Sequence, residues 1–232
     1  MADILNMEIL ENTFIKIAHR GASGYKPENT AKSYEKAIEL NADMIEFDVR
    51  ESLDGHLVVM HDETVDRTTD GSGLVAMKTL SDLKELDAGE GERIPTVEEV
   101  LELGKDRTKF VLELKQDGVE DKVISLLNKY DLLEDVFIVS FKPKRLRMIK
   151  ELEPKLRTGL IILAAINPVE LTKRCGADFI APYHKFITKS LVDSATQNGL
   201  HTFTWTVDEY LKAQSLREKG VRGIVTNKPD VI

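Results

Sequence analysis

Residues 44–62 read MIEFDVRESLDGHLVVMHD, and this stretch decides how the rest of the chain is interpreted. Successive side chains of an extended strand point to opposite faces, so Glu46 and Asp48 share one face and the apolar residues beside them share the other. A carboxylate that faces a protein interior is costly unless it is paired or binds a cation. Two of them at positions i and i+2 therefore predict a buried strand that helps to hold a cation.

The same stretch continues into a hairpin. Asp54-Gly55 is a typical turn dipeptide, and the apolar run at 57–60 predicts a short second strand after it. His61 and Asp62 follow that strand directly. The stretch thus brings carboxylates and an imidazole to one end of a rigid sheet.

The rest of the chain repeats one pattern, in which an amphipathic helix is followed by a glycine or asparagine and then by an apolar strand. The expected strands lie at 14–18, 43–50, 109–114, 136–140, 156–163, 177–181, 200–205 and 221–225, and the expected helices start at 29 or 30 and then cover 118–130, 143–153, 168–175, 188–198 and 208–219. Apolar strands that alternate with helices form parallel sheets, and eight such units predict a closed (β/α)₈ TIM barrel.

Two segments depart from a plain barrel. The chain between the second and third expected barrel strands is too long for one helix and two loops, so we interpret residues 51–107, approximately, as a small insertion within a single domain spanning 1–232. Ile232 follows the eighth strand closely, so we expect the last barrel helix to be short or absent. A short last helix would leave part of the barrel surface uncovered, and residues 2–12 are a candidate cover for it. The same uncovered surface makes a homo-oligomer a candidate assembly.

Bulk properties narrow the function classes. The formal net charge is −8, and no basic stripe is present that would neutralise nucleic-acid phosphates. Cys175 is the only cysteine, which excludes an intrachain disulfide and favours a packing role for its thiol. No apolar run is long enough to cross a bilayer, and the first residues carry acids where a signal peptide has bases, so we expect a cytoplasmic protein without stable membrane insertion.

Active sites of (β/α)₈ barrels lie where the strands end. Four expected strands end in side chains that a core would not favour, namely His19 with Arg20, Glu46 with Asp48, Glu113 with Lys115, and Trp205. Glu113 and Lys115 repeat the i, i+2 spacing of Glu46 and Asp48, so both are expected to face the lumen. Three carboxylates then converge there. Oxygen ligands without thiolates or histidine clusters predict a hard divalent cation, Mg²⁺ or Ca²⁺. The alternative is a salt-bridge network, but three acids against two bases leave a charge deficit.

With these residues the chain resembles the glycerophosphodiester phosphodiesterase family of TIM barrels. The matching motifs occur in family order over about 15–230, and they are His19-Arg20-Gly21, Pro27-Glu28-Asn29-Thr30, Glu46-Phe47-Asp48-Val49, Asp54-Gly55, His61-Asp62, the Leu74 to Leu86 segment, Ile94-Pro95-Thr96, Glu113-Leu114-Lys115, Ser140-Phe141, Trp205-Thr206-Val207 and Gly223 to Asp230. Each motif is weak alone, and together they are specific.

The resemblance implies metal-dependent hydrolysis of glycerophosphodiesters to sn-glycerol 3-phosphate and an alcohol such as choline or ethanolamine. By motif position it assigns general acid and base roles to His19 and His61, metal binding to Glu46, Asp48 and Glu113, and phosphate contacts to Arg20 and Lys115. Trp205 either fills the top of the barrel or lines the alcohol pocket. Family members are thought to use the glycerol 2-hydroxyl as first nucleophile, which gives a cyclic phosphate, and the sequence leaves the route open.

The assigned roles agree with the needs of the reaction. A phosphodiester needs its nonbridging oxygens neutralised as negative charge shifts, and a cation with Arg20 and Lys115 would do this in a low-dielectric lumen. It also needs one proton removed and one delivered. Two imidazoles on opposite sides of phosphorus can exchange those roles near neutral pH.

Three other functions remain open. A phospholipase D-like barrel acting on lysophospholipids would want an apolar groove or membrane-binding loop, yet residues 52–95 contain no aromatic residue apart from histidine and no long apolar run beyond 57–60. A catalytically silent barrel that binds a phosphate ligand would have lost a histidine or metal carboxylate, and none is missing. A metal-dependent sugar isomerase would not explain Arg20 and Lys115 beside His19 and His61.

Overall fold

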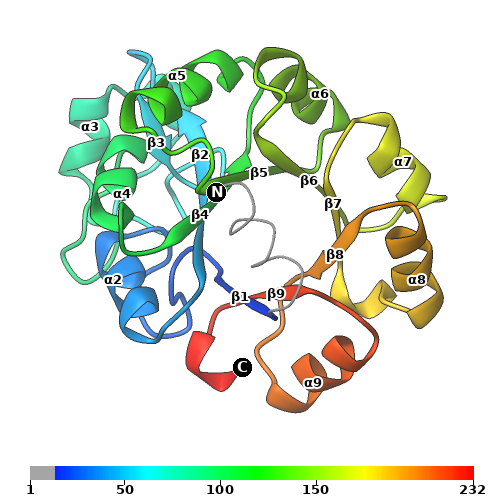
Figure 1. The fold of residues 1–232 in the computed structure, drawn as a ribbon. Coiled ribbons are helices and arrows are strands. Elements are labelled where there is room, and N and C mark those ends of the chain that lie inside the picture. Colours follow the sequence, from blue (N-terminus) through cyan, green and yellow to red (C-terminus); the bar gives the residue numbers. More distant parts are fainter. Residues whose placement is uncertain (1–13) are drawn as a thin grey trace.

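The computed structural model describes residues 14–232 and shows a ring of strands surrounded by helices (Figure 1). The cover suggested for residues 2–12 lies outside the described residues. The strands are β1 (Ile15–Ala18), β2 (Met44–Glu51), β3 (Leu57–Val59), β4 (Lys109–Leu114), β5 (Val136–Ser140), β6 (Arg157–Ile162), β7 (Phe179–Pro182), β8 (His201–Thr204) and β9 (Gly223–Thr226). The helices are α2 (Ala31–Glu39), α3 (Leu80–Glu85), α4 (Val97–Gly104), α5 (Glu120–Tyr130), α6 (Pro143–Leu152), α7 (Pro168–Arg174), α8 (Lys189–Gln197) and α9 (Tyr210–Glu218), with short 3₁₀ turns η1 (Val75–Met77), η2 (His184–Phe186) and η3 (Pro229–Val231).

The predicted (β/α)₈ TIM barrel is confirmed. Eight parallel strands follow the order β1-β9-β8-β7-β6-β5-β4-β2, and pairing of β1 with β2 closes the ring. β3 pairs antiparallel with the end of β2, as the Asp54-Gly55 turn predicts. After β9 only the turn η3 follows, in agreement with a short or absent last helix. The single-domain assignment and the insertion bounds 51–107 stay predictions.

Strand alternation sorts side chains into two apolar layers. On β2, Ile45 and Phe47 face outward and belong to the cluster between the strands and the helices, which also includes Cys175. Met44 points the other way and packs in the lumen with Phe179 and Phe203. Full burial of each such side chain stabilises the fold by roughly 1.5–3 kcal/mol. The lumen packing therefore forms a rigid apolar floor, above which the next inward residues of β2 are carboxylates.

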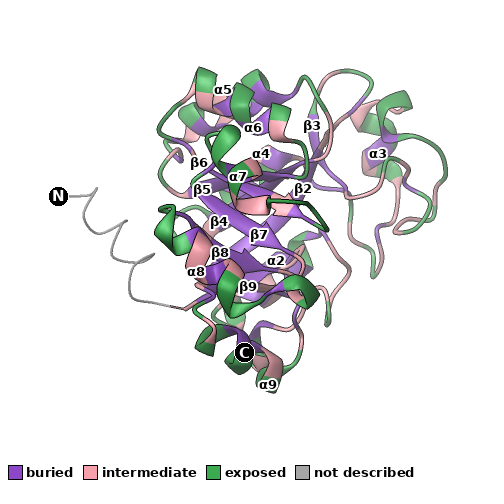
Figure 2. Cartoon of the chain, turned by 90° about the vertical axis from the view of Figure 1, so that its right-hand side faces the viewer, coloured by how far each residue is buried: buried purple, intermediate pink, exposed green. Residues whose placement is uncertain are grey.

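The segment between β3 and α4 forms its own small cluster beside the barrel. Val58 and Met60 pack there with residues of the following loops and of α3, including Val75 and Leu83. Figure 2 shows α3 and its loops projecting past one end of the strands. Met60 is buried in this cluster. Its burial fixes the backbone position of the next residue, His61. Among residues 14–232, no helix is long and apolar enough to cross a membrane.

Candidate active site

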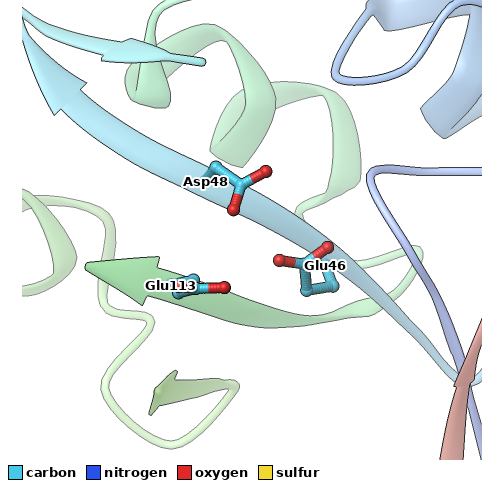
Figure 3. Close-up of side chains that lie close together, drawn as sticks. All are labelled: Glu46, Asp48 and Glu113. Carbon is cyan, nitrogen blue, oxygen red and sulfur yellow. The ribbon is translucent and has the colours of Figure 1, made fainter. Parts of the chain in front are cut away.

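Three carboxylates converge at the ends of β2 and β4. Glu46 and Asp48 share the inner face of β2, and the register places Asp48 opposite Glu113 on β4. One oxygen from each side chain lies within 4.8 Å of the others, and all three residues are buried. Figure 3 shows the carboxylates turned toward the same space from the two strands. The predicted convergence of these residues is therefore present in the structure.

Two cations contact this cluster without balancing it. Lys115 Nζ lies 2.8 Å from Glu113 Oε1 and 3.2 Å from Asp48 Oδ1, and Arg20 Nε lies 3.2 Å from Asp48 Oδ2. The contact of Lys115 with Asp48 lacks hydrogen-bond geometry, so the buried Asp48 Oδ1 has no hydrogen-bond partner. Three acids face two bases, as the residue count predicts. An orphaned buried carboxylate oxygen among two further carboxylates suits a metal ligand set.

The pKa values report the same imbalance. Burial, together with the charge of Asp48, raises the pKa of Glu46 well above its usual range and raises that of Glu113 to about 7. Burial also opposes ionisation of Asp48, but the charges of Lys115 and Arg20 outweigh it and lower that pKa. Mutual repulsion of this kind is relieved when a divalent cation binds. The donor set is thus consistent with a divalent metal site.

The loop after β1 wraps around the cluster through its backbone. Arg20 has a left-handed φ of 55°, and its N–H donates to Glu46 Oε2 at 2.8 Å. Gly21 follows with a φ of +77°, and a Cβ there would lie 2.4 Å from Ser33 Oγ, so the tight turn requires glycine. Asn29 also adopts a left-handed conformation and donates from Nδ2 to Asp48 Oδ2 at 2.9 Å. Its amide therefore orients a carboxylate, and the adjacent Thr30 caps α2 instead.

His19 is held by a relay from the opposite end of the chain. Its Nδ1 lies 2.8 Å from Asn227 Oδ1. Asp208 fixes the direction of that amide, because Asn227 donates from Nδ2 and from its backbone N–H to the Asp208 carboxylate, each at 2.7 Å. The oxygen of Asn227 must then face His19, so Nδ1 carries the proton and Nε2 is left with its lone pair. Burial, reinforced by the charge of Arg20, lowers the pKa of His19 to about 4.

His61 is held from both its backbone and its ring. Arg50 donates from Nε and Nη2 to the His61 carbonyl oxygen, at 3.1 and 2.8 Å. Nδ1 of His61 lies 2.6 Å from Asp62 Oδ1, which again leaves Nε2 free. Burial lowers the pKa of this imidazole, although the carboxylates of Asp48 and Asp62 oppose the shift. Both histidines are therefore neutral near pH 7 with the same ring nitrogen available.

One pocket joins these groups. It is a cavity of about 300 Å³ whose polar side is lined by His19, Arg20, Glu46, His61, Glu113 and Lys115. Its opposite side is apolar, with Val139, Phe203 and the aromatic pair Phe141 and Trp205, whose rings meet edge to face at 5.5 Å. The structure thus brings the predicted residues to one place, with Asp48 buried behind Arg20 and Lys115. Trp205 both lines the pocket and is anchored, since its Nε1 donates to Ala181 O at 2.8 Å.

Comparison with known proteins agrees with this geometry. The Glycerophosphoryl diester phosphodiesterase family matches residues 19–231. The chain is 41% identical over 230 residues to a glycerophosphodiester phosphodiesterase of Caldanaerobacter subterraneus subsp. tengcongensis, across 93% of this chain and 95% of that protein. The chain belongs to this family. As a family member it is classed among the phosphodiesterases, which are hydrolases.

Solved structures share the fold of this chain. A crystal structure of glycerophosphodiester phosphodiesterase from Agrobacterium tumefaciens matches with a TM-score of 0.86 and 29% identity, over 94% of this chain and 98% of that one. An Oleispira antarctica phosphodiesterase in complex with the product sn-glycerol-3-phosphate matches with a TM-score of 0.89 and 28% identity, over 96% of each chain.

Sequence reasoning missed several residues that support this phosphodiesterase site. Asn227 lies in the Gly223 to Asp230 motif and Asp208 directly follows the Trp205-Thr206-Val207 motif, but no role was assigned to either residue. Arg67 lies in the polar loop at 66–73, whose composition is typical of a solvated turn. In the structure it bridges two carboxylates, with Nε and Nη2 bonded to Asp62 at 2.6 and 3.2 Å and Nη1 and Nη2 bonded to Glu28 at 2.8 and 2.7 Å. Glu28 in turn accepts from Arg20 Nη1 at 2.8 Å, so one insertion residue links the partners of His61 and Arg20.

Replacing Arg67 with alanine is expected to lower kcat about tenfold, because Asp62 and Glu28 lose the group that orients them. The freed charge of Asp62 would also raise the pKa of His61, which can be followed by NMR of the ring protons. Arg67→Lys would rescue little, since an ammonium cannot bridge two carboxylates as a guanidinium fork does. Arg93→Ala, which removes another exposed arginine of the insertion, is the control. An unchanged kcat together with an unchanged His61 pKa would reduce Arg67 to a surface ion pair.

Proposed function

We propose that the chain hydrolyses glycerophosphodiesters to sn-glycerol 3-phosphate and an alcohol, using two histidines as general acid and base. The observation that carries the proposal is the convergence of two imidazoles, two cations and three carboxylates on one pocket. The relatives support it, because one is named a glycerophosphodiester phosphodiesterase and another is solved with sn-glycerol-3-phosphate as product.

In this proposal Glu46, Asp48 and Glu113 hold one divalent cation, Mg²⁺ or Ca²⁺. When bound, such an ion would neutralise nonbridging phosphate oxygens and favour attack at phosphorus. Arg20 and Lys115 lie on the pocket wall beside the carboxylates, where they would bind and orient the same phosphate through charge-assisted hydrogen bonds. The apolar wall that includes Trp205 would then receive the uncharged parts of the diester.

The two histidines have different partners, and this difference assigns their first roles. His19 is bonded to a neutral amide and has a pKa lowered to about 4, so its Nε2 starts as the proton acceptor. His61 is bonded to the Asp62 carboxylate, which stabilises an imidazolium. The protonated form of His61, a minor form at pH 7 because burial lowers its pKa, is therefore the one that donates a proton from Nε2 to the leaving alcohol. On the route through a cyclic phosphate, the two histidines exchange their acid and base roles when water opens that phosphate.

Release of sn-glycerol 3-phosphate from glycerophosphocholine and glycerophosphoethanolamine tests the function. The metal-stripped chain would be titrated separately with Mg²⁺ and Ca²⁺, and we expect release that depends on the metal. A substrate analogue without the glycerol 2-hydroxyl separates the two routes, because the cyclic phosphate route needs that hydroxyl and direct attack by water does not. Folded protein that releases no product with either ion would favour a barrel that acts on lipid substrates or the silent binding barrel.

Replacing Asn227 with alanine is expected to lower kcat about 10- to 100-fold, because the ring of His19 loses the bond that sets its tautomer. That bond raises the pKa of His19, so its loss would move the acid limb of kcat/KM to lower pH. The base must be neutral, and activity falls as pH drops through its pKa. Asp208→Asn should give a smaller loss of the same kind. A KM effect alone, with kcat and the acid limb unchanged, would contradict the positioning role. Asn198→Ala, on an exposed helix end, is the control.

A further inference from the structure

Exposed apolar side chains gather after half of the barrel strands, at the carboxyl ends of those strands. Six large apolar side chains are exposed on the connections that follow four neighbouring strands, β5, β6, β7 and β8. We call them the rim patch, and they are Phe141, Leu163, Ile166, Phe186, Tyr210 and Leu211. Ile166 is 93% exposed and Leu211 is 78% exposed. All six follow the carboxyl ends of strands, the end of the barrel at which the candidate active site lies.

The rim patch is continuous with the pocket. Phe141 belongs to both, since it is exposed to solvent and also lines the cavity against Trp205. The sequence argument against a lipid-facing rim considered the insertion, residues 52–95, where Leu53, Leu74 and Met77 are exposed apolar side chains. The rim patch lies instead on the connections after β5 to β8. A surface that touches the rim patch would therefore also face the mouth of the pocket.

Lysines stand among these apolar side chains. Lys142 and Lys144 follow Phe141, Lys185 precedes Phe186, and Lys212 follows Leu211. Among the ion pairs of residues 14–232, none involves these four ammonium groups, and Lys185 Nζ lies over the Tyr183 ring at 5.9 Å. The whole chain carries a net charge of −8, whereas next to these apolar side chains in the sequence the four lysines outnumber the exposed Glu209, which precedes Tyr210. Apolar side chains flanked by unpaired lysines are the features that bind an anionic lipid surface.

We propose that the rim patch docks the protein on anionic lipid surfaces, with the pocket mouth facing the headgroups. A second copy of this chain is the competing occupant, and charge disfavours it. In a two-fold interface the same patch would meet itself, so the lysines of both copies would be brought together. An anionic surface instead pairs with the lysines while the apolar side chains enter the headgroup layer. This inference goes beyond the proposed hydrolysis and does not require it.

Co-sedimentation with vesicles tests the docking without using turnover. The full chain, free of metal, would be mixed with vesicles of phosphatidylcholine alone or of phosphatidylcholine with phosphatidylglycerol. We expect binding that needs phosphatidylglycerol and weakens as salt is raised, with each lysine contributing about fivefold in affinity. Absence of binding at low salt would overturn the proposal.

Variants locate the contact. Ile166→Asp with Leu211→Asp is expected to weaken vesicle binding at least about tenfold, and Lys185→Glu with Lys212→Glu should act similarly. Leu152→Asp is the matched control, because Leu152 is 44% exposed at the end of α6, on the opposite end of the barrel. All variants should keep the thermal midpoint of the wild-type chain, which checks the fold, and their hydrolysis of soluble glycerophosphocholine should be unchanged. Two results would refute lipid docking through the rim patch. One is an equal loss of vesicle binding in the Leu152→Asp control. The other is that no variant binds vesicles while sedimentation velocity shows a dimer that the rim variants abolish.

Discussion

Replacing His19 or His61 with alanine is expected to abolish measurable turnover and to leave the fold intact. A general acid or base contributes about 10²- to 10⁴-fold, and each variant loses one of them. Both imidazoles lie on the pocket wall and outside the apolar clusters, so their removal opens no cavity in the core. Release of sn-glycerol 3-phosphate measures the loss, and an unchanged thermal midpoint shows that the barrel is still folded.

His56→Ala is the control for this prediction, because His56 is an exposed histidine in the β2–β3 hairpin, close in sequence to His61 but outside the pocket lining. It should retain full activity. Near-full activity of His61→Ala on every diester tested would show that the acid and base assignment is wrong.

Removal of the metal is the second large effect. The metal-stripped chain should be inactive and should recover with a divalent cation, while Glu46→Ala should need far more of that cation, because one of three ligands is lost. Metal binding also stabilises the folded state, by about 2.7 kcal/mol at a concentration of 100 times Kd. The thermal midpoint of the wild-type chain should therefore rise with added metal, and calorimetry gives the affinity of each variant.

The metal-free protein offers a readout that does not depend on activity. Glu46 and Glu113 have raised pKa values, so the folded state holds protons that the unfolded state releases. Stability should then fall as pH rises from the ordinary glutamate value of about 4.5 through about 7, where Glu113 ionises. Glu46→Gln should lessen that fall and also lose the stabilisation by metal.

Glu51→Gln, on the same strand but paired with Lys122, is the control for the carboxylate cluster. It should leave both the pH dependence and the effect of metal unchanged. A Glu46→Gln chain whose midpoint still rises with metal as in the wild type would exclude Glu46 from the ligand set.

The parts of the fold and site that the sequence predicts are those carried by local periodicity. The alternation of Glu46, Phe47 and Asp48 is a property of one strand, and it assigns each side chain to the lumen or to the helices before any tertiary contact is known. The Asp54-Gly55 turn likewise predicts β3. Strand ends meet at one face of a barrel, so the convergence with Glu113 follows from topology.

The relays that hold the histidines were not predictable in this way. The bond between His19 and Asn227 joins residues 208 positions apart, and it depends on which rotamers face each other once the barrel has closed. The residues around Arg67 have the composition of a solvated turn. Only the folded insertion brings its guanidinium between Asp62 and Glu28. The rim patch has no periodicity, since its six residues come from four separate connections.

Closure of the ring by β1 has a consequence for biosynthesis. β1 pairs with β9 on one side and β2 on the other, and the residue that orients His19 follows β9. A nascent chain can assemble the strands from β2 to β8 as they leave the ribosome, but its first histidine acquires its partner only when the final strand has emerged. Catalytic competence therefore requires that β9 has left the ribosome, which happens after every other barrel strand has been made.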